Sequence, residues 1–201
     1  MMKKVVILFC YFVFILNNAQ SQDNSIRPFD NYFHVGFFQF FTGTFYLGYE
    51  RMINEKSSLL LSGGITLVDQ SYEERIGGQA NIEYRFFALK GSNNDFFIDF
   101  DGVYLGPYLK YKNLNVTDID EYASGGPLEE KYHFETVGGG VLVGIKLTVT
   151  DRIFFDFNLG GGIQYEFNED NTNDSYWSGD IFSPGYTGVL PAGNFTFGLK
   201  F

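Results

Sequence analysis

Apolar and polar residues alternate along most of the chain, and this period of two is the feature that most restricts its fold. Between positions 152 and 167, Ile153, Phe155 and Phe157 share one side of an extended strand, while Asp156 lies on the other. Successive side chains of a β-strand point to opposite faces. The alternation is therefore typical of strands with one apolar and one polar face, and it predicts an all-β protein.

Turn residues divide the alternation into eight predicted strands. Their expected bounds are Tyr32–Phe41, Thr44–Ile53, Ser57–Val68, Glu74–Leu89, Phe96–Tyr111, Tyr132–Val149, Arg152–Phe167 and Leu190–Phe201. The alternation slips by one residue around Gly102–Tyr104 and again near Phe134–Val137. We interpret both slips as β-bulges, in which one strand carries an extra residue.

Alternation by itself fits a soluble sandwich as well as a membrane barrel, and three observations favour the barrel. The chain begins with a secretion signal, and the strand-rich part after it contains no cysteine. Several stretches reach the roughly 9–11 residues that a tilted transmembrane strand requires. Short connections (NEK, KGSNND, TD) alternate with long ones (NLNVTDIDEYASGGPLEEK and NEDNTNDSYWSGDIFSPGYTGV), as in outer-membrane barrels. We expect an eight-stranded antiparallel up-and-down transmembrane β-barrel, with both termini on the periplasmic side.

The start of the chain has the composition of a secretory signal peptide. The positive residues of MMKK precede the apolar run VVILFCYFVFIL, and Ala19 and Ser21 then suit the −3 and −1 positions of a cleavage site. A transmembrane anchor is the alternative, but the apolar run is short for one. Cys10 lies inside that run, so we do not expect a lipidated cysteine. We expect a signal peptide at 1–21, a periplasmic segment at 22–31 and the barrel at 32–201.

The chain ends in NFTFGLKF, in which Phe195, Phe197, Leu199 and Phe201 share one face. This ending resembles the C-terminal assembly signal of outer-membrane barrels, which the barrel-assembly machinery recognises. In its strand pattern the whole chain resembles small eight-stranded barrels of the OmpA and OmpX type. The stretch LGYERMINEKSSLLLSGG is similar to a strand-turn-strand unit of uncharacterised bacterial barrel families. The resemblance implies a bacterial outer-membrane location and contact with the assembly machinery, and it implies nothing about activity.

Charged residues also occur on the face that would line the interior. An eight-stranded barrel is just wide enough for side chains to fill it, so buried charges should pair with one another. We expect Arg85, Lys146 and Lys200 each to bridge two carboxylates. A polar plug that fixes the strand register is favoured over an ion or proton pathway. The expected interior network consists of Glu50, Glu83, Arg85, Asp99, Asp101, Lys146, Asp156, Glu166 and Lys200.

The sequence offers few candidates for catalysis or cofactor binding. No G-x-S-x-G motif is present, and His133 in YHFET has no serine two residues away, so we expect neither catalytic residues nor a cofactor. The formal net charge of −10 argues against nucleic acid as a partner. Weak candidates for calcium ligands are the loop acids Glu169, Asp170 and Asp174, which lack the order of an EF-hand.

The predicted function is therefore that of an integral outer-membrane barrel with a structural or interaction role. Outer-membrane lipid and lipopolysaccharide would contact it, and two long extracellular loops would serve adhesion, surface stabilisation or a larger outer-membrane complex. An interfacial anchor or a contact surface is expected from Tyr176, Trp177, Phe182 and Tyr186. The alternatives are a narrow pore or carrier for small hydrophobic molecules, and an enzyme that acts on lipid at the rim through His133.

Overall fold

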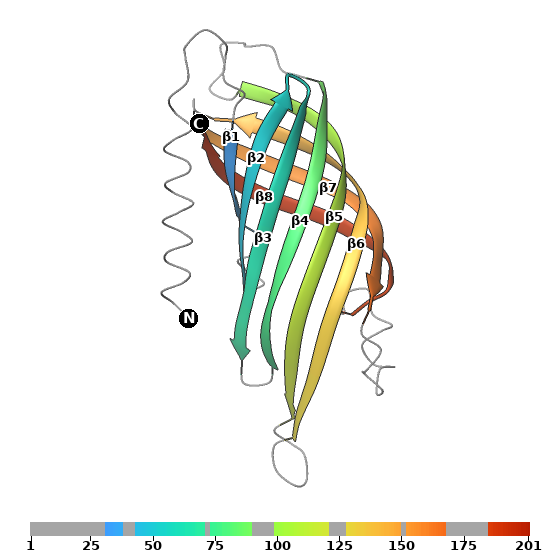
Figure 1. The fold of residues 1–201 in the computed structure, drawn as a ribbon. Helices are drawn as coiled ribbons and strands as arrows, with labels where there is room; N and C mark the ends of the chain where they lie inside the picture. Colours follow the sequence, from blue (N-terminus) through green and yellow to red (C-terminus); the bar gives the residue numbers. More distant parts are fainter. Residues whose placement is uncertain are drawn as a thin grey trace.

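Eight antiparallel strands follow one another around a closed ring (Figure 1). The computed structural model describes residues 31–37, 43–70, 73–89, 99–120, 128–149, 152–167 and 185–201. The strands are β1 (Asn31–Gly36), β2 (Thr44–Asn54), β3 (Ser57–Gln70), β4 (Glu73–Leu89), β5 (Asp99–Asp120), β6 (Leu128–Thr148), β7 (Ile153–Glu166) and β8 (Gly188–Lys200). The predicted eight-stranded up-and-down barrel is confirmed. No helix in the described ranges is long and apolar enough to cross a membrane.

The predicted bounds of β2, β3, β4, β7 and β8 agree with the structure to within two residues. Asn31, assigned to the segment before the barrel, is instead the first residue of β1 and pairs with Arg51. The predicted end of the first strand after Phe37, the signal peptide at 1–21 and the rest of the 22–31 segment lie outside the described residues.

Strands β5 and β6 are longer than predicted. β5 continues to Asp120 instead of ending at Tyr111, and β6 begins at Leu128 instead of Tyr132. The polar segment expected to be a long loop is thus mostly paired strand, and the prediction of that loop was wrong. Backbone groups in a ladder satisfy one another whatever side chains they carry, so polar composition did not prevent pairing.

One of the two predicted bulges is confirmed. The pairing of β5 with β6 shifts register between Phe100 and Gly102. Gly102 has a φ of +149°, which residues with a Cβ rarely adopt. A glycine therefore suits this position, where the ladder takes in an extra residue.

The bulge predicted near Phe134 was wrong, because the register of β5 with β6 continues unbroken through the Leu114–Phe134 pair. Phe134 faces inward and is buried with Leu114 and Val116. Because Phe134 is apolar and faces inward, the sequence there resembles a shift of the apolar face by one residue. A small apolar cluster inside the barrel, not an extra residue, accounts for the pattern.

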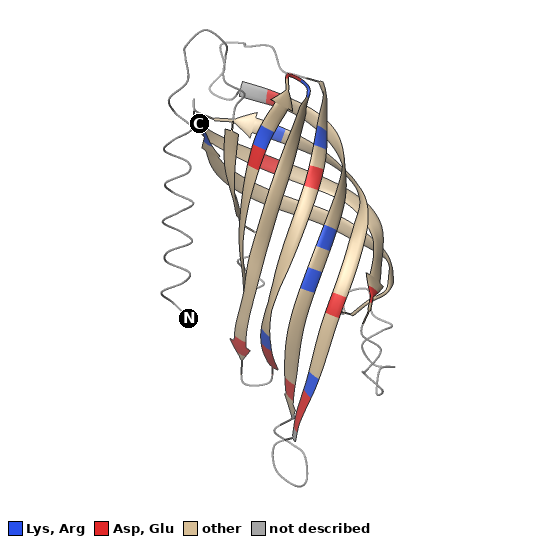
Figure 2. Cartoon of the chain, viewed as in Figure 1, with Lys and Arg blue, Asp and Glu red and all other residues tan. Residues whose placement is uncertain are grey.

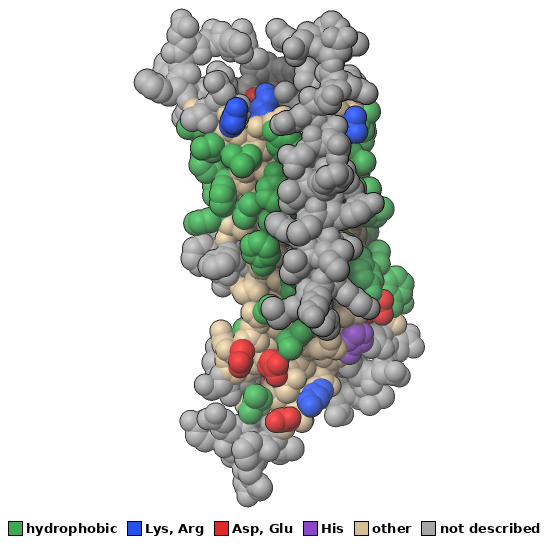
Figure 3. Space-filling view, turned by 60° about the vertical axis from the view of Figure 1, so that its left-hand side comes forward, with side chains coloured by type: hydrophobic (Ala, Val, Ile, Leu, Met, Phe, Trp, Pro, Cys, Tyr) green, Lys and Arg blue, Asp and Glu red, His purple; other side chains and the backbone are tan. Residues whose placement is uncertain are grey.

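The outer wall of the barrel is apolar and its inner face is charged. Leu61, Leu109 and Ile163 expose half or more of their side-chain surface on the outside. Figure 3 shows such side chains gathered between cationic residues at one end and mixed charges at the other. Inside, Arg85 and Lys146 are fully buried. A soluble domain has the opposite distribution, with most large apolar side chains inside and most charged side chains in water.

The C-terminal strand follows the same pattern. Phe197, Leu199 and Phe201 are exposed on the outer face, Phe195 is partly buried, and Thr196 between them is buried on the inner face. The backbone of Phe201 exchanges hydrogen bonds with that of Asn31, so the described chain ends meet at one end of the barrel.

At the opposite end, β3 to β6 project beyond the other strands (Figure 1). β6 pairs with β5 as far as Leu128, whereas its pairing with β7 begins only at Thr136. We call the part formed by residues 67–70, 73–76, 113–120 and 128–135 the projecting sheet.

Gly144 on β6 provides a test of the inner packing. A Cβ at this position would overlap the ring of Tyr104, which faces it across the β5–β6 ladder. We expect Gly144→Ala to displace that ring and to lower the free energy of unfolding by about 1–3 kcal/mol, as overpacked cores do. Urea unfolding of the detergent-solubilised barrel measures this. Gly78→Ala is the matched control, because the nearest atom to its Cβ would lie at 3.7 Å. Equal losses in both variants would contradict the assigned packing.

Candidate functional site

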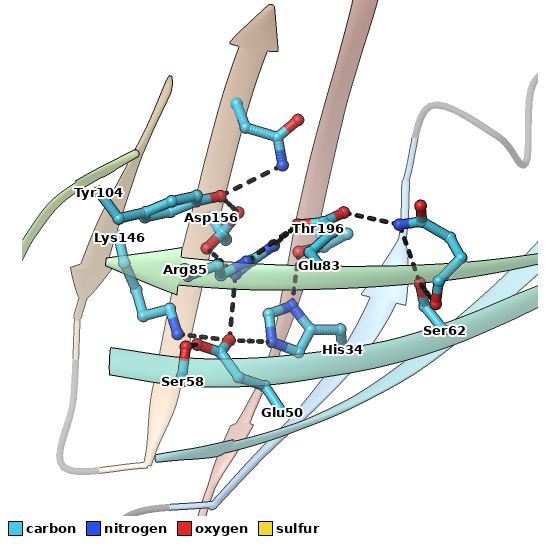
Figure 4. A network of polar contacts seen from close by, with 12 residues as sticks. His34, Glu50, Ser58, Ser62, Glu83, Arg85, Tyr104, Lys146, Asp156 and Thr196 are labelled. Atoms are coloured by element: carbon cyan, nitrogen blue, oxygen red, sulfur yellow. Dashed lines mark hydrogen bonds and ion pairs between the residues drawn. The ribbon is translucent and has the colours of Figure 1, made fainter. Parts of the chain in front are cut away.

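Glu50 of β2 is the centre of a buried charge network inside the barrel (Figure 4). Its carboxylate accepts hydrogen bonds from four described side chains. Lys146 Nζ lies at 2.6 Å, His34 Nε2 at 2.8 Å, Arg85 Nη1 at 3.0 Å and Ser58 Oγ at 2.5 Å. A carboxylate only accepts, so Nε2 of His34 carries a proton. Four donors on one buried carboxylate compensate for much of the hydration that it has lost.

Arg85 of β4 links this carboxylate to two others. Its Nη1 donates to Asp156 Oδ2 at 2.9 Å as well as to Glu50, and its Nε and Nη2 donate to Glu83 Oε2 at 2.9 and 2.8 Å. The hydroxyl of Tyr104 donates to the second oxygen of Asp156 at 2.8 Å. The guanidinium therefore joins β2, β4 and β7 at one point in the lumen, where charge-assisted hydrogen bonds are strong.

Closure of the ring brings these side chains together. Glu50 and Lys146 are 96 residues apart in sequence, and Arg85 and Asp156 are 71 apart. Each occupies an inward position of its strand, and the inward positions of all strands share one narrow lumen. The network consequently crosses the barrel between strands that are not neighbours in the sheet.

Aromatic rings surround Lys146 beside the network. Its Nζ lies 3.8 Å from the ring centroid of Tyr32 and 5.4 Å from those of Phe87 and Phe154. A desolvated ammonium over aromatic faces gains cation–π stabilisation. Tyr32, Phe87 and Phe154 also form a buried apolar cluster with Met52 and Tyr104. The network and this cluster together fill the part of the lumen nearer the described chain ends, and we call them the plug.

Five of the nine predicted interior residues meet in the plug. They are Glu50, Glu83, Arg85, Lys146 and Asp156, all buried. The expectation that each cation bridges two carboxylates does not describe the contacts. Arg85 forms ion pairs with three carboxylates, whereas the ion pair of Lys146 is with Glu50.

The other predicted interior residues lie elsewhere along the strands. Asp101 is half-buried and accepts a hydrogen bond from Thr148 Oγ1 at 2.5 Å. Lys200 Nζ lies 5.7 Å from the Tyr32 ring centroid. Glu166 lies at the far end of β7, where its backbone N–H donates to Thr187 Oγ1 at 3.1 Å.

The remaining predicted residue, Asp99, pairs with Thr148 in the β5–β6 ladder, and its side chain lies outside the described part.

Several members of the network were missing from the predicted set. His34, Ser58, Tyr104, Asn158 and Thr196 are all buried on the inner face. Asn158 Nδ2 donates to the Tyr104 hydroxyl at 3.2 Å, and His34 Nδ1 lies 2.9 Å from Thr196 Oγ1. The alternation placed each of them on the inner face, so strand phase was the available signal. The predicted interior network contained only Asp, Glu, Lys and Arg, so these residues were not included.

The other predicted sites are outside the plug or outside the described residues. Glu169, Asp170 and Asp174 lie outside the described residues, as do Tyr176, Trp177 and Phe182. His133 lies on the outer face of the projecting sheet, with its Nδ1 2.7 Å from Asn115 Oδ1. The backbone carbonyl of Tyr186 accepts a hydrogen bond from Gln164 Nε2 at 2.9 Å. Among the described residues no group of three or more His, Cys, Asp or Glu is arranged to hold a metal ion.

The chemistry of the plug is that of a structural element. Its three carboxylates are each bonded to a cation, and the network is packed between aromatic rings. A cavity of about 190 Å³ begins on the side of the plug that faces the projecting sheet, where Glu83 and Asn158 contribute to its lining. The plug therefore divides the lumen into a filled part and a hollow part.

Comparison with known proteins adds a family and one distant structure. A family model described as "Protein of unknown function (DUF3575)" matches residues 7–181. Among solved structures, the chain is similar to the N-terminal β-barrel domain of Pseudomonas aeruginosa OprF, with 13% sequence identity and a TM-score of 0.35 over 87% of this chain and 98% of that one. No curated protein matches significantly. A TM-score this low adds nothing to what the strand topology shows.

The contribution of the plug is measurable by a double-mutant cycle on Glu50 and Lys146. We expect Glu50→Ala to leave Lys146 buried without its carboxylate and to lower the free energy of unfolding by about 3–5 kcal/mol. Adding Lys146→Met should recover part of this loss, with a coupling of about 0.5–3 kcal/mol. Urea unfolding in detergent micelles reports both values.

The control for this cycle is Glu129→Ala on the projecting sheet. Glu129 forms an ion pair with Lys131 at 3.8 Å, and their side chains are 60% and 74% exposed. Its loss should cost about 0–1 kcal/mol. Additive effects of the two plug substitutions would show that Glu50 and Lys146 do not act as a pair.

Proposed function

The chain belongs to this family of proteins of unknown function, and from its structure we propose that it is an integral β-barrel of the bacterial outer membrane. Its role is structural or one of interaction, not enzymatic. Strands closed into a ring leave no backbone edge along the wall, which is the condition for crossing lipid as a sheet.

The apolar outer wall is the observation that carries this proposal. Soluble monomers rarely expose contiguous apolar patches larger than a few hundred Å². Here exposed apolar side chains occur on every strand from β2 to β8, including Phe45, Leu61, Ile82, Leu109, Val143, Leu159 and Phe197. Lipid acyl chains are the environment that suits such a wall.

The two ends of the barrel support an orientation. The described chain ends meet at one end, where the Asn54–Ser57 turn is short. The polar projecting sheet extends from the other. In outer-membrane barrels short turns face the periplasm and longer segments face outside. The termini are accordingly assigned to the periplasm, and the projecting sheet to the cell surface, beside lipopolysaccharide.

The C-terminal strand supports recognition by the barrel-assembly machinery during biogenesis. Phe197, Leu199 and Phe201 alternate on the outer face, as the resemblance to the assembly signal implies. Nucleic acid is not a proposed partner, because the chain carries a net charge of −10.

The plug argues against a pore, which is the first alternative function. Arg85, Lys146 and Asp156 are almost completely buried where a channel would need open water. The second alternative, an enzyme at the rim, would need a reactive group near His133. The Nδ1 of His133 lies 2.7 Å from the amide oxygen of Asn115, and an amide is not a general base. Interaction therefore remains the better-supported role.

The projecting sheet is the part of the molecule best suited to interaction. Its outward residues are largely polar, for example Asn113, Asn115 and Thr117, unlike the apolar wall. We propose that the projecting sheet contacts a partner protein in a larger outer-membrane complex.

Membrane insertion is tested by an arginine on the apolar wall. Phe157 is 43% exposed, between Ile145 and Phe195 of the neighbouring strands. We expect Phe157→Arg to destabilise the barrel folded in lipid vesicles by about 2–4 kcal/mol, because the arginine would lie in the lipid. Asn115→Arg, on the outer face of the projecting sheet, is the matched control and should fold like the unmodified protein. The proposal would be contradicted if the unmodified protein were soluble without detergent, or if both arginine variants were destabilised equally.

The interaction role is tested by shortening the projecting sheet. Thr117 pairs with Lys131, so residues 118–130 can be replaced by a two-residue Asn-Gly turn without changing the register of the remaining strands. We expect the shortened barrel to reach the outer membrane and to keep its heat-dependent gel migration. Cross-linking in native membranes should then lose partners that the full chain captures. Capture of the same partners by both chains would contradict a role for this sheet.

A further inference from the structure

The hollow part of the lumen is polar and large enough for a solute. Its volume is about 190 Å³, and Tyr108, Lys110 and Gln164 are among its lining residues. A water molecule occupies about 30 Å³ of liquid, so several waters fit beside a small ion. The plug bounds this cavity on one side, and we therefore infer that solutes enter from the side of the projecting sheet.

Two buried polar atoms that lack partners in the described part of the chain favour a hydrated cavity. The side-chain oxygens of Asn81 and Asn158 are buried without a hydrogen-bond partner among the described residues, and both residues line the cavity. Buried polar atoms of this kind are usually satisfied by ordered water. An ion in the cavity would thus keep part of its hydration.

Two lysines of β5 supply positive charge beside the cavity. Lys110 lines it, and Lys112 pairs with Gln79, which also lines it. Lys110 and Lys112 lie on the inner face, midway along the strand where Figure 2 shows basic positions. Both are partly buried, and within the described ranges neither has an ion pair or a hydrogen bond. Their Cα atoms are about 7 Å apart, the spacing of alternate residues in a strand. Two like charges so placed, away from bulk water, destabilise one another unless an anion joins them.

The carboxylates of neighbouring strands have other contacts. Glu73 forms an ion pair with Arg75 on β4, at 2.6 Å, which adds a third cation near Lys112. Glu83 is bonded to Arg85 and Asn81 within the plug.

Two further acids lie near the same row of the sheet. Glu135 of β6 faces outward and accepts a hydrogen bond from Tyr111 at 2.6 Å. Glu166 is two strands away from Lys112, beyond Thr136, and forms no ion pair with it. The described carboxylates around the two lysines thus leave their charges uncompensated.

We propose that a small soluble oxyanion binds at the edge of the cavity, between the ammonium groups of Lys110, which lines it, and Lys112, the next residue on the same inner face. A phosphate or carboxylate group provides oxygens for both cations, and charge-assisted hydrogen bonds of this kind are strong. The hydroxyl of Tyr108 reaches across the lumen to Gly162 and is a further donor. The ion comes from solution and not from a lipid headgroup, because the barrel wall separates the cavity from lipid.

The test is a titration of the full mature barrel in detergent micelles with inorganic phosphate, at constant ionic strength, followed by amide chemical shifts. We expect saturable shifts at residues 108–112 and at Gly138, which lines the cavity. Lys110→Met and Lys112→Met should each weaken binding about tenfold or more, the size of one charge-assisted hydrogen bond. Lys131→Met is the control, since Lys131 is exposed on the projecting sheet and should leave binding unchanged.

Other measurements test the site if a lysine variant fails to fold. Tyr108→Phe keeps both lysine charges and removes one donor, so it should weaken phosphate binding by a few-fold. If the Tyr108 hydroxyl had only a structural role, phosphate binding would not change. A linear response to phosphate in the unmodified barrel would overturn the site, as would equal binding by the double lysine variant. Saturation by short-chain phosphatidate but not by phosphate would overturn the soluble source. None of these measurements tests membrane insertion, so the absence of phosphate binding would not contradict the proposed function.

Discussion

The pairing of β1 with β8 is the contact on which the rest of the structure depends. Tyr32 to Gly36 pair with Lys200 to Thr196, and these pairs turn a curled sheet into a ring. Closure leaves the wall without an edge and gives it an inside and an outside. Charges on the inner face then have no route to bulk solvent except along the lumen. The charges that are fully buried therefore pair with one another in the plug.

The plug in turn supports the seam. Thr196 of β8 lies beside the ring of His34 on β1, and His34 donates to Glu50 on β2, so a chain of buried hydrogen bonds crosses the closing pair of strands. Gly198 and Phe154 pair on β8 and β7 next to it, and the Phe154 ring packs on His34 at a centroid distance of 4.7 Å. Opening the seam would break both the ladder and this network, so barrel closure and plug formation should be cooperative.

The lumen changes character along its length because different side chains share the inner face. Near the chain ends it is filled by paired charges and aromatic rings, with every cation of the plug matched to a carboxylate. Further along, Lys110 lines a polar cavity, Lys112 follows it on the same inner face, and Leu114 begins a small apolar cluster beyond them. A packed plug, a polar cavity and a polar projecting sheet thus follow one another along the barrel.

Local side-chain periodicity determined much of this protein, including the number of strands, which residues face inward and the bulge at Gly102. It did not determine the length of β5 and β6, because polar residues pair in a ladder as readily as they form a loop. Nor did it show that Phe134 belongs inside. Only the tertiary structure decided which inward residues meet. Contacts such as Arg85 with Asp156 depend on the stagger between strands around the ring, and a period of two within each strand carries no information about that stagger.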